Sequence, residues 1–312
     1  MGNFVTIKEA YEKWQLITDE RIDRLNKKER RINEIFIDKY ELTNELSPDV
    51  NIEDGTLHVP DLNREVRSFI SYSVGCMFGR YTPDKERVVY AGDEWDSSRY
   101  KLFLPDEDNC IPITDEEYFS DDIVTRFVEF VKTVYGTDTL EENLDFIANV
   151  LGNKGDTSRE VIRNYFLKDF YADHLKVYQK RPIYWMFDSG KQNGFKALIY
   201  MHRYDADTVG RVRTDYLHKA QKYVETAMQS AQYTIDNATS ASEKSKATKA
   251  VTKYTKQLAE MKIYDEAIAH VANQRIEIDL DDGVKVNYAK FQGVEVAQEG
   301  KKSLKIDLLA KI

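Results

Sequence analysis

Cysteine and long apolar runs are both scarce in this 312-residue chain, and each scarcity excludes a class of protein. The two cysteines, Cys76 and Cys110, lie far apart, and neither has a cysteine or histidine nearby at metal-ligand spacing, which argues against a disulfide framework and a structural zinc. The longest apolar stretch, Phe69–Phe78, is far shorter than the ~20 residues that cross a bilayer, and the N-terminus lacks a signal-peptide pattern. We therefore expect a cytoplasmic protein with reduced thiols and no membrane contact.

Sequence motifs for catalysis are also missing. No Pro-Pro pair occurs, and no Gly-x-Gly follows an apolar, strand-like run. The five histidines are scattered, and none lies three or four residues from another histidine or a cysteine, so each fits a structural role better than a metal site. Residues 152–158 superficially resemble a phosphate-binding loop, but the lysine is misplaced and no strand precedes it, which favours a helix-capping turn. The sequence thus offers no catalytic or metal-binding residue.

Charge is distributed unevenly along the chain. The net charge is −9 at pH 7, and residues 84–122 alone hold thirteen acidic against four basic residues. Residues 176–222 hold ten lysines and arginines against four acidic residues, together with His202 and His218. Because salt screens a charge beyond ~10 Å, a local basic segment can attract phosphate even on an acidic protein.

Apolar periodicity predicts a mainly α fold. Ile7–Leu42 repeats apolar residues at three- and four-residue steps, which predicts a long amphipathic helix in an N-terminal segment, residues 1–46. Between Gly210 and Gly283 there is neither glycine nor proline. Two apolar stripes in residues 207–273 flank a capping-box signal, Ser240 and Glu243, and predict a long antiparallel helical hairpin.

The other segments complete a predicted helical domain with a few short β-hairpins. Residues 47–206 are predicted as a helical core, with helices at 61–78, 121–135, 140–151 and 156–179. Proline and glycine breaks in residues 84–122 predict an ordered surface insertion with extended pieces at 87–90 and 100–104. Residues 274–312 are predicted as a C-terminal β-hairpin and tail, because Asp282-Gly283 lies between alternating apolar residues from Ile276 to Tyr288.

Bases alternate with aromatic residues in residues 180–205, which are predicted to form a β-hairpin around a glycine-flanked turn. Guanidinium and ammonium groups neutralise phosphates, and arginine can also read a guanine edge. One interpretation is DNA contact by the cations of this hairpin and the next helix, namely Arg181, Lys191, Lys196, His202, Arg203, Arg211 and Arg213. In the alternative interpretation, the aromatic residues lie in the core and the basic residues only form the solvent-exposed side of the hairpin. For Tyr184, Trp185 and Tyr200 we favour the core.

Four blocks of sequence carry a resemblance to a known family: Asn33–Tyr40, Phe69–Tyr81, Arg181–His218 and Asn273–Phe291. They occur in order over nearly the whole chain and resemble the PglX family, the adenine-specific DNA methyltransferases of bacteriophage-exclusion (BREX) systems. Members of this family are much longer, so the chain looks like their C-terminal region. The resemblance implies host DNA modification and phage defence, with S-adenosylmethionine as the cofactor of the intact enzyme.

The resemblance carries over no cofactor residue and leaves two functions open. The glycine-rich turn and the Asn/Asp-Pro-Pro-aromatic loop of such enzymes have no counterpart here, so we expect the chain to be inactive alone. In the first reading it is a non-catalytic DNA-binding or architectural region that clamps double-stranded DNA beside the methyltransferase catalytic half. In the second it is a docking scaffold for other BREX subunits, through residues 207–273 and the acidic insertion. An independent enzyme is the least favoured reading.

Overall fold

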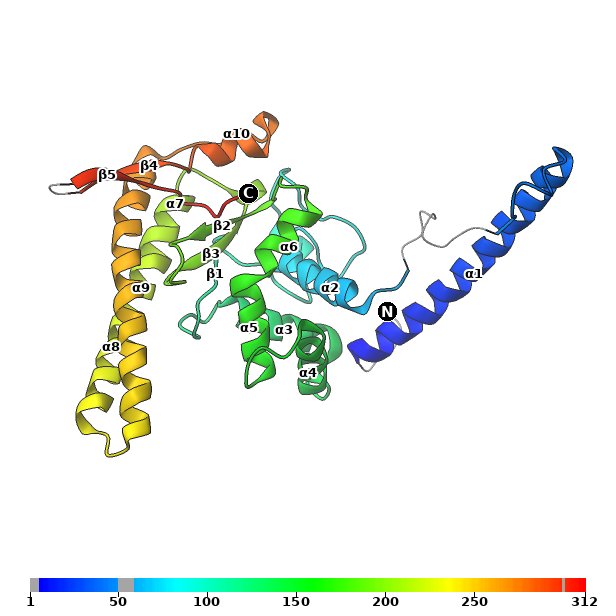
Figure 1. Cartoon of the computed structure of the whole chain (residues 1–312). Coiled ribbons are helices and arrows are strands. Elements are labelled where there is room, and N and C mark those ends of the chain that lie inside the picture. The colour runs from blue at the N-terminus through cyan, green and yellow to red at the C-terminus, as the bar shows by residue number, and fades with distance from the viewer. Residues whose placement is uncertain (1–5, 50–58, 299–300) are drawn as a thin grey trace.

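The computed structural model describes residues 6–49, 59–298 and 301–312, so parts of the predicted segments 1–46, 47–206 and 274–312 lie outside the described residues. The described chain is mainly helical with two small antiparallel sheets, which confirms the predicted fold class. A central body carries two projections: helix α1 (Ile7–Lys39) at one end, and the hairpin of α8 (His218–Asn237) and α9 (Ala241–Gln274) at the other (Figure 1). No described helix combines the length and apolarity needed to cross a membrane.

A three-stranded antiparallel sheet lies at the centre of the body. Its strands are β1 (Ile111–Pro112), β2 (Tyr184–Asp188) and β3 (Lys196–Tyr200), in the order β1–β3–β2. The β2–β3 pair is the hairpin predicted in residues 180–205. Strands buried on both faces read as continuous apolar runs, which explains the aromatic and aliphatic residues along β2 and β3.

The sheet separates two apolar clusters, because successive side chains of a strand point to opposite faces. Tyr184 and Met186 belong to the cluster formed with the helices of residues 62–177, whereas Trp185 and Phe187 belong to the cluster formed with α8 and α9. Tyr200 is fully buried in the first cluster. The aromatic residues that the sequence favoured as core are therefore core.

The helices that contribute to the first apolar cluster are α2 (Leu62–Met77), α3 (Ile123–Tyr135), α4 (Leu140–Leu151), α5 (Ser158–Lys168) and α6 (Phe170–Val177). Asp61 caps α2 as predicted, and its carboxylate accepts a hydrogen bond from the backbone N–H of Arg64. The single helix predicted over 156–179 is wrong, because the chain bends at Asp169 between α5 and α6. The bend brings α6 to β2, where Nε2 of His174 accepts a hydrogen bond from the backbone N–H of Tyr184 (3.2 Å).

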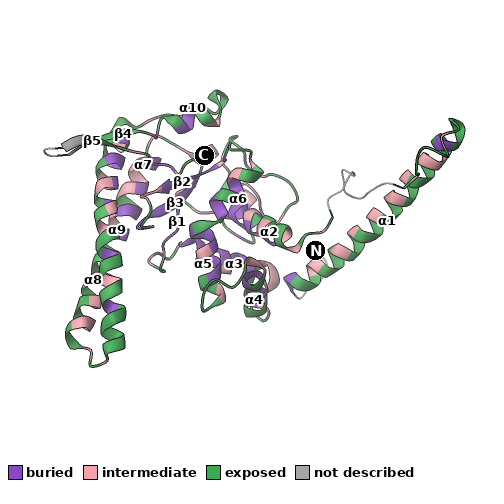
Figure 2. Ribbon diagram, viewed as in Figure 1, coloured by how far each residue is buried: buried purple, intermediate pink, exposed green. Residues whose placement is uncertain are grey.

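The second face is covered by a short helix, α7 (Thr208–Arg211), a π-helical stretch at Val212–Leu217, and the predicted helical hairpin of α8 and α9, which is confirmed. Ser240 caps α9 by accepting from the backbone N–H of Glu243, as its spacing predicted. The half of the hairpin nearest the body packs on the sheet, and the distal half projects beyond the body with most of its surface exposed (Figures 1 and 2).

The acidic segment 84–122 is exposed over much of its length, and its aromatic residues anchor it in the body. Neither predicted extended piece, 87–90 or 100–104, is a strand, and most of the segment is irregular apart from the short turn at Ser97–Arg99 and β1. Tyr90 and Phe103 are buried in the first apolar cluster. The aromatic residues between the acids therefore determine where this segment packs.

The β-hairpin predicted around Asp282-Gly283 is also wrong. Gly283 (φ +79°) precedes α10 (Val284–Ala289), and the side-chain amide of Asn287 donates to the Gly283 carbonyl (3.2 Å), which stabilises a helical turn. A hairpin follows later, formed by β4 (Val294–Gln298) and β5 (Lys301–Ile306). Short 3-10 turns in the described chain lie at Ser97–Arg99, Met201–Arg203 and Leu280–Asp282.

Helix α1 is the predicted amphipathic helix, but most of its apolar face is uncovered. The backbone N–H of Ile7 donates to Oδ1 of Asn143 (2.7 Å), which fixes the first turn of α1 to α4. Only Ile7 and Ile37 of α1 are buried, and the helix extends away from the body (Figures 1 and 2). Its large exposed apolar residues are Trp14, Leu16, Ile17, Ile32, Ile35 and Phe36.

Candidate functional site

Internal partners hold most of the seven cations that the sequence predicted to contact DNA. Lys196 lies on β3 with a side chain only 8% exposed, and its Nζ is 2.6 Å from Oδ2 of Asp188. These two residues are opposite each other in the β2–β3 register. The ammonium of Lys196 therefore neutralises the Asp188 carboxylate on β2 and is not exposed to a ligand.

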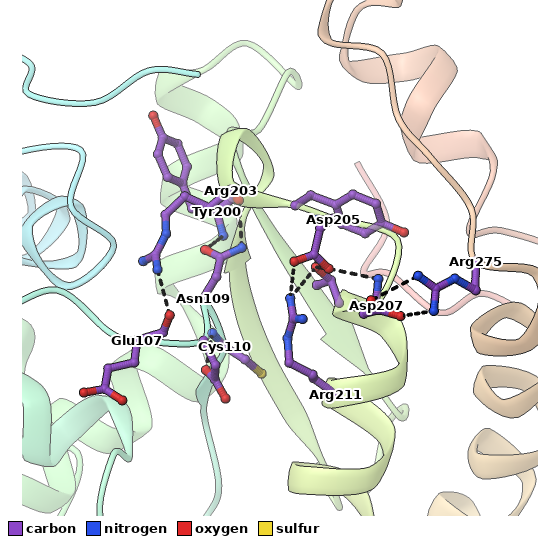
Figure 3. A network of polar contacts seen from close by, with 12 residues as sticks. Glu107, Asn109, Cys110, Tyr200, Arg203, Asp205, Asp207, Arg211 and Arg275 are labelled. Carbon is purple, nitrogen blue, oxygen red and sulfur yellow. Dashed lines mark hydrogen bonds and ion pairs between the residues drawn. The ribbon is translucent and has the colours of Figure 1, made fainter. Parts of the chain in front are cut away.

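Arg203 binds the acidic segment rather than solvent. Its guanidinium lies over the Trp95 ring, 3.9 Å from the ring centroid. It also donates hydrogen bonds to the backbone carbonyl oxygens of Asp106 (2.8 Å) and Glu107 (3.0 Å), and Figure 3 shows the bond to Glu107. Burial lowers the pKa of Arg203, although the carboxylate of Asp106 opposes this shift. The side chain therefore fastens the β2–β3 hairpin to segment 84–122.

His202 lies beside the same segment. Its backbone carbonyl accepts a hydrogen bond from the Tyr90 hydroxyl (2.9 Å), and its ring centroid is 4.8 Å from that of Tyr200. Burial, and then the positive charge of Arg80, lower the pKa of His202. Its imidazole is consequently neutral at pH 7 and adds nothing to a cationic surface.

Arg211 and Arg213 are paired with carboxylates where the helical hairpin joins the body. Nη2 of Arg211 is 2.8 Å from Oδ2 of Asp205 (Figure 3). Nε of Arg213 is 2.8 Å from Oδ1 of Asp265, which His218 also contacts at 2.9 Å. Burial alone would raise the pKa of Asp265, but the hydrogen bonds from these two partners outweigh it and lower the pKa.

Arg181 and Lys191 differ from the other five, because both are exposed and neither has an ion-pair partner in the part of the chain that the structure describes. Arg181 precedes β2 and Lys191 follows it, so they lie toward opposite ends of that strand. The seven cations therefore do not form one surface. Their contact with DNA stays a prediction, and these two have the geometry for it.

A second group of cations, not singled out from the sequence, lies on α9. Lys246, Lys249, Lys253 and Lys256 recur at steps of three and four residues, and all four are exposed. The spacing was visible in the sequence, but periodic lysines more often form only the solvated face of a helix. The fold adds what the sequence lacked, namely that the turn carrying Lys191 is bonded to α9 beside them.

Two carboxylates of the acidic segment meet at Tyr216. The Tyr216 hydroxyl lies 2.8 Å from Oδ2 of both Asp108 and Asp121. Burial, and then the charge of Asp108, raise the pKa of Asp106 to about 7. Among residues 6–49, 59–298 and 301–312, no three histidines, cysteines or acidic residues are grouped to hold a metal ion.

The strand-and-turn pattern that commonly holds a nucleotide cofactor is not found among the described residues. A nucleotide cofactor in an α/β enzyme lies where a parallel strand leads through a glycine-rich turn into a helix. Both described sheets are antiparallel, and β3 leads through the turn at Met201–Arg203 without a glycine. No step of methyl transfer is assigned to these residues.

Comparison with known proteins gives the following relatives. The chain is 47% identical over 290 residues to the adenine-specific methyltransferase PglX of Lacticaseibacillus casei (strain Zhang), a match covering 92% of this chain and 24% of that protein. It is 41% identical over 239 residues to the adenine-specific methyltransferase BrxX of Escherichia coli O9:H4 (strain HS), covering 72% and 20%. No family model matches. The predicted resemblance is confirmed, and the chain spans about a quarter of the length of these relatives.

Proposed function

We propose that this chain, which is homologous to part of the adenine-specific methyltransferases PglX and BrxX, is a non-catalytic region of such an enzyme. The identity of 47% over 290 residues supports the relationship to these enzymes, and the absence of a Pro-Pro pair and of a Gly-x-Gly turn after an apolar run supports the non-catalytic assignment. In the whole enzyme the region would serve host DNA modification and phage defence, acting on double-stranded DNA. The catalytic half, with S-adenosylmethionine, would precede it, which makes this the C-terminal region.

Its first task would be to contact duplex DNA outside the reacting base. Of the seven cations predicted for this contact, Arg181 and Lys191 are exposed without an ion pair to any described residue, whereas Lys196, Arg203, Arg211 and Arg213 support the fold. Exposed basic side chains favour contacts with phosphates, which position a protein on DNA without reading its sequence. In this proposal the chain contributes affinity for DNA and orients the enzyme on the duplex, and it does not recognise the modified motif.

The test combines two assays on the purified chain. Methyl transfer is measured with duplex DNA and radiolabelled S-adenosylmethionine, and duplex binding by fluorescence anisotropy. We expect no methyl transfer, and binding that weakens at least tenfold between about 50 and 200 mM salt, because each phosphate contact releases a counterion. Methyl transfer by the chain alone would overturn the non-catalytic assignment. Absence of binding at the lower salt concentration would overturn the DNA-contact role.

A second function, protein docking, is favoured by the apolar face of α1. Large exposed apolar patches on soluble proteins mark interaction sites, and burying a side chain such as Phe36 or Ile32 contributes roughly 1.5–3 kcal/mol. The occupant we propose is the remainder of the methyltransferase, because the relatives extend far beyond the length of this chain. Docking on other BREX subunits is the competing occupant.

Co-purification tests this docking role. The chain is coexpressed with the remainder of the enzyme as a separate polypeptide, and Ile32→Asp/Phe36→Asp is compared with Glu20→Ala/Asp23→Ala, a control at exposed polar positions of the same helix. We expect the apolar variant to lose co-purification and the control to keep it. Equal recovery of both variants, or self-association of the chain through α1 in sedimentation, would contradict the proposed occupant.

A further inference from the structure

We propose that the lysine row of α9 (Lys246, Lys249, Lys253 and Lys256), extended by Lys191, lies along the phosphate backbone of the duplex that the enzyme modifies. The choice of DNA as the partner rests on the proposed function. The position of the contact rests on the geometry of the helical hairpin and of the β2–β3 turn.

The row lies on one side of a projecting helix. At 3.6 residues per turn and a 1.5 Å rise, four lysines at these steps share one flank of α9 over roughly 15 Å. Lys244 and Lys262 fall on the opposite flank. Phosphates of one strand recur about every 3.4 Å along a duplex, so the row spans several of them. The half of α9 that begins at Ala241 projects from the body (Figure 1).

The β2–β3 turn adds Lys191 to the end of the row. The Ser189 hydroxyl donates to Oε1 of Glu260 (3.0 Å), and the Gln192 backbone N–H donates to Oε2 (2.9 Å). The side-chain amide of Gln257 donates to the Gln192 carbonyl (3.2 Å). Lys191 therefore lies beside the turn of α9 that follows Lys256. Both oxygens of Glu260 are occupied by this turn, which limits its repulsion of a phosphate.

Most of the lysines in the row have no ion pair with a described carboxylate. Between Ala241 and Lys262, α9 carries six lysines against Glu243 and Glu260. Lys253 is the member of the row with described ion pairs, at 2.7 Å from Oδ2 of Asp115 and 3.9 Å from Oε1 of Glu116. The other three are exposed without such a pair, in contrast to the arginines at the base of the hairpin.

The chemistry of lysine determines what this surface can do. An ammonium is a mobile point charge that satisfies a phosphate but lacks the planar fork with which arginine reads a base edge. A row of lysines therefore supplies affinity that does not depend on sequence. The hairpin would act as an arm along the duplex, beside the site where the catalytic half modifies adenine.

Two matched charge reversals test the proposal. Lys249→Glu/Lys256→Glu alters the row, and Lys244→Glu/Lys262→Glu makes the same change of net charge on the opposite flank of α9. Duplex affinity is measured by fluorescence anisotropy, with circular dichroism and thermal melting confirming that both variants fold. We expect the row variant to lose at least about tenfold in affinity and roughly 2 units of salt slope, and the control to stay within about twofold of the unmodified chain.

The outcomes separate the inference from the proposed function. Equal losses of duplex affinity in both variants would mean that only net charge matters. This result would overturn the inference about the lysine row and leave the proposed DNA binding intact. Unchanged affinity in the row variant would overturn it as well. Failure of the unmodified chain to bind duplex would overturn the DNA-contact role itself. Lys249→Gln/Lys256→Gln, which removes charge without reversing it, provides the second measurement if the glutamate variant unfolds, and we expect it to weaken binding less.

Discussion

The guanidinium of Arg203 lies 3.9 Å from the centroid of the Trp95 ring, although 108 positions separate the two residues along the chain. The contact joins the basic hairpin to the acidic segment 84–122. Two segments that the sequence distinguished by opposite charge therefore pack against each other inside one body. This contact serves the fold, and the proposed DNA surface lies elsewhere.

Replacing Arg203 should therefore weaken the fold more than it weakens DNA binding. Arg203→Ala removes a cation–π contact and leaves the carbonyls of Asp106 and Glu107 without a donor, which we expect to cost about 2–4 kcal/mol of unfolding free energy. Urea denaturation measures this loss. The exposed Arg181→Ala serves as control and should change stability by less than about 0.5 kcal/mol. A normal unfolding curve for Arg203→Ala with lost DNA affinity would contradict this assignment.

The ion pair of Arg163 and Asp122 should contribute strongly to stability. Two nitrogens of Arg163 donate to the two carboxylate oxygens of Asp122 at 2.7 and 2.8 Å, and the side chains are 11% and 0% exposed. Arg163→Ala leaves a buried carboxylate unpaired, which costs about 3–5 kcal/mol. The surface pair of Arg159 and Glu141 is the control, since Arg159→Ala should cost less than about 1 kcal/mol. Similar urea midpoints for both variants would refute the difference.

Stability should depend on pH through Asp106. Burial raises its pKa to about 7 from a usual value near 4, so between these values the folded chain binds a proton that the unfolded chain releases. The contribution of this group therefore stabilises the fold as pH falls from about 8 to 5. Asp106→Asn should reduce that pH dependence by on the order of 1–3 kcal/mol. An identical stability difference between the two pH values in both proteins would show that another group is responsible.

Both thiols should be unreactive in the folded protein. Burial raises the pKa of Cys76 to about 12, and burial together with nearby carboxylates raises the pKa of Cys110 well above its usual value. Because the thiolate is the reacting form, neither cysteine should react with a thiol reagent at pH 8 until the protein unfolds. Titration with such a reagent in buffer and in urea measures this. Prompt modification of a thiol in buffer would contradict the burial of that residue.

The sequence predicted the elements whose apolar pattern is local. Helix α1 and the hairpin of α8 and α9 follow from three- and four-residue periodicity, and the β2–β3 hairpin follows from a glycine-flanked turn between apolar runs. The turn signal failed at Asp282-Gly283, because Asn287 bonds back to Gly283 and stabilises a helix in place of a strand. Local turn chemistry was outweighed by a hydrogen bond four residues away.

Whether each cation is paired or exposed could not be predicted from the sequence, because its partner is distant along the chain. Arg213 meets Asp265 across 52 positions, and Arg203 meets the carbonyl of Asp106 across 97. From composition alone these arginines look like free positive charge. Only the folded chain shows that each is bound to a carboxylate or a backbone carbonyl. The lysine row was overlooked for the opposite reason, since its lysines looked like an ordinary solvated helix face until the turn with Lys191 was seen beside it.

Lysine acetylation footprinting with and without duplex DNA tests the central claim most directly. The proposed contact is one flank of α9 together with Lys191, while Lys196, Arg203, Arg211 and Arg213 hold the fold. Mass spectrometry should show that duplex DNA protects Lys191, Lys246, Lys249 and Lys256, and that Lys244 and Lys262 react equally in both samples. Protection of the opposite flank, or equal acetylation of all these lysines with and without DNA, would contradict the account.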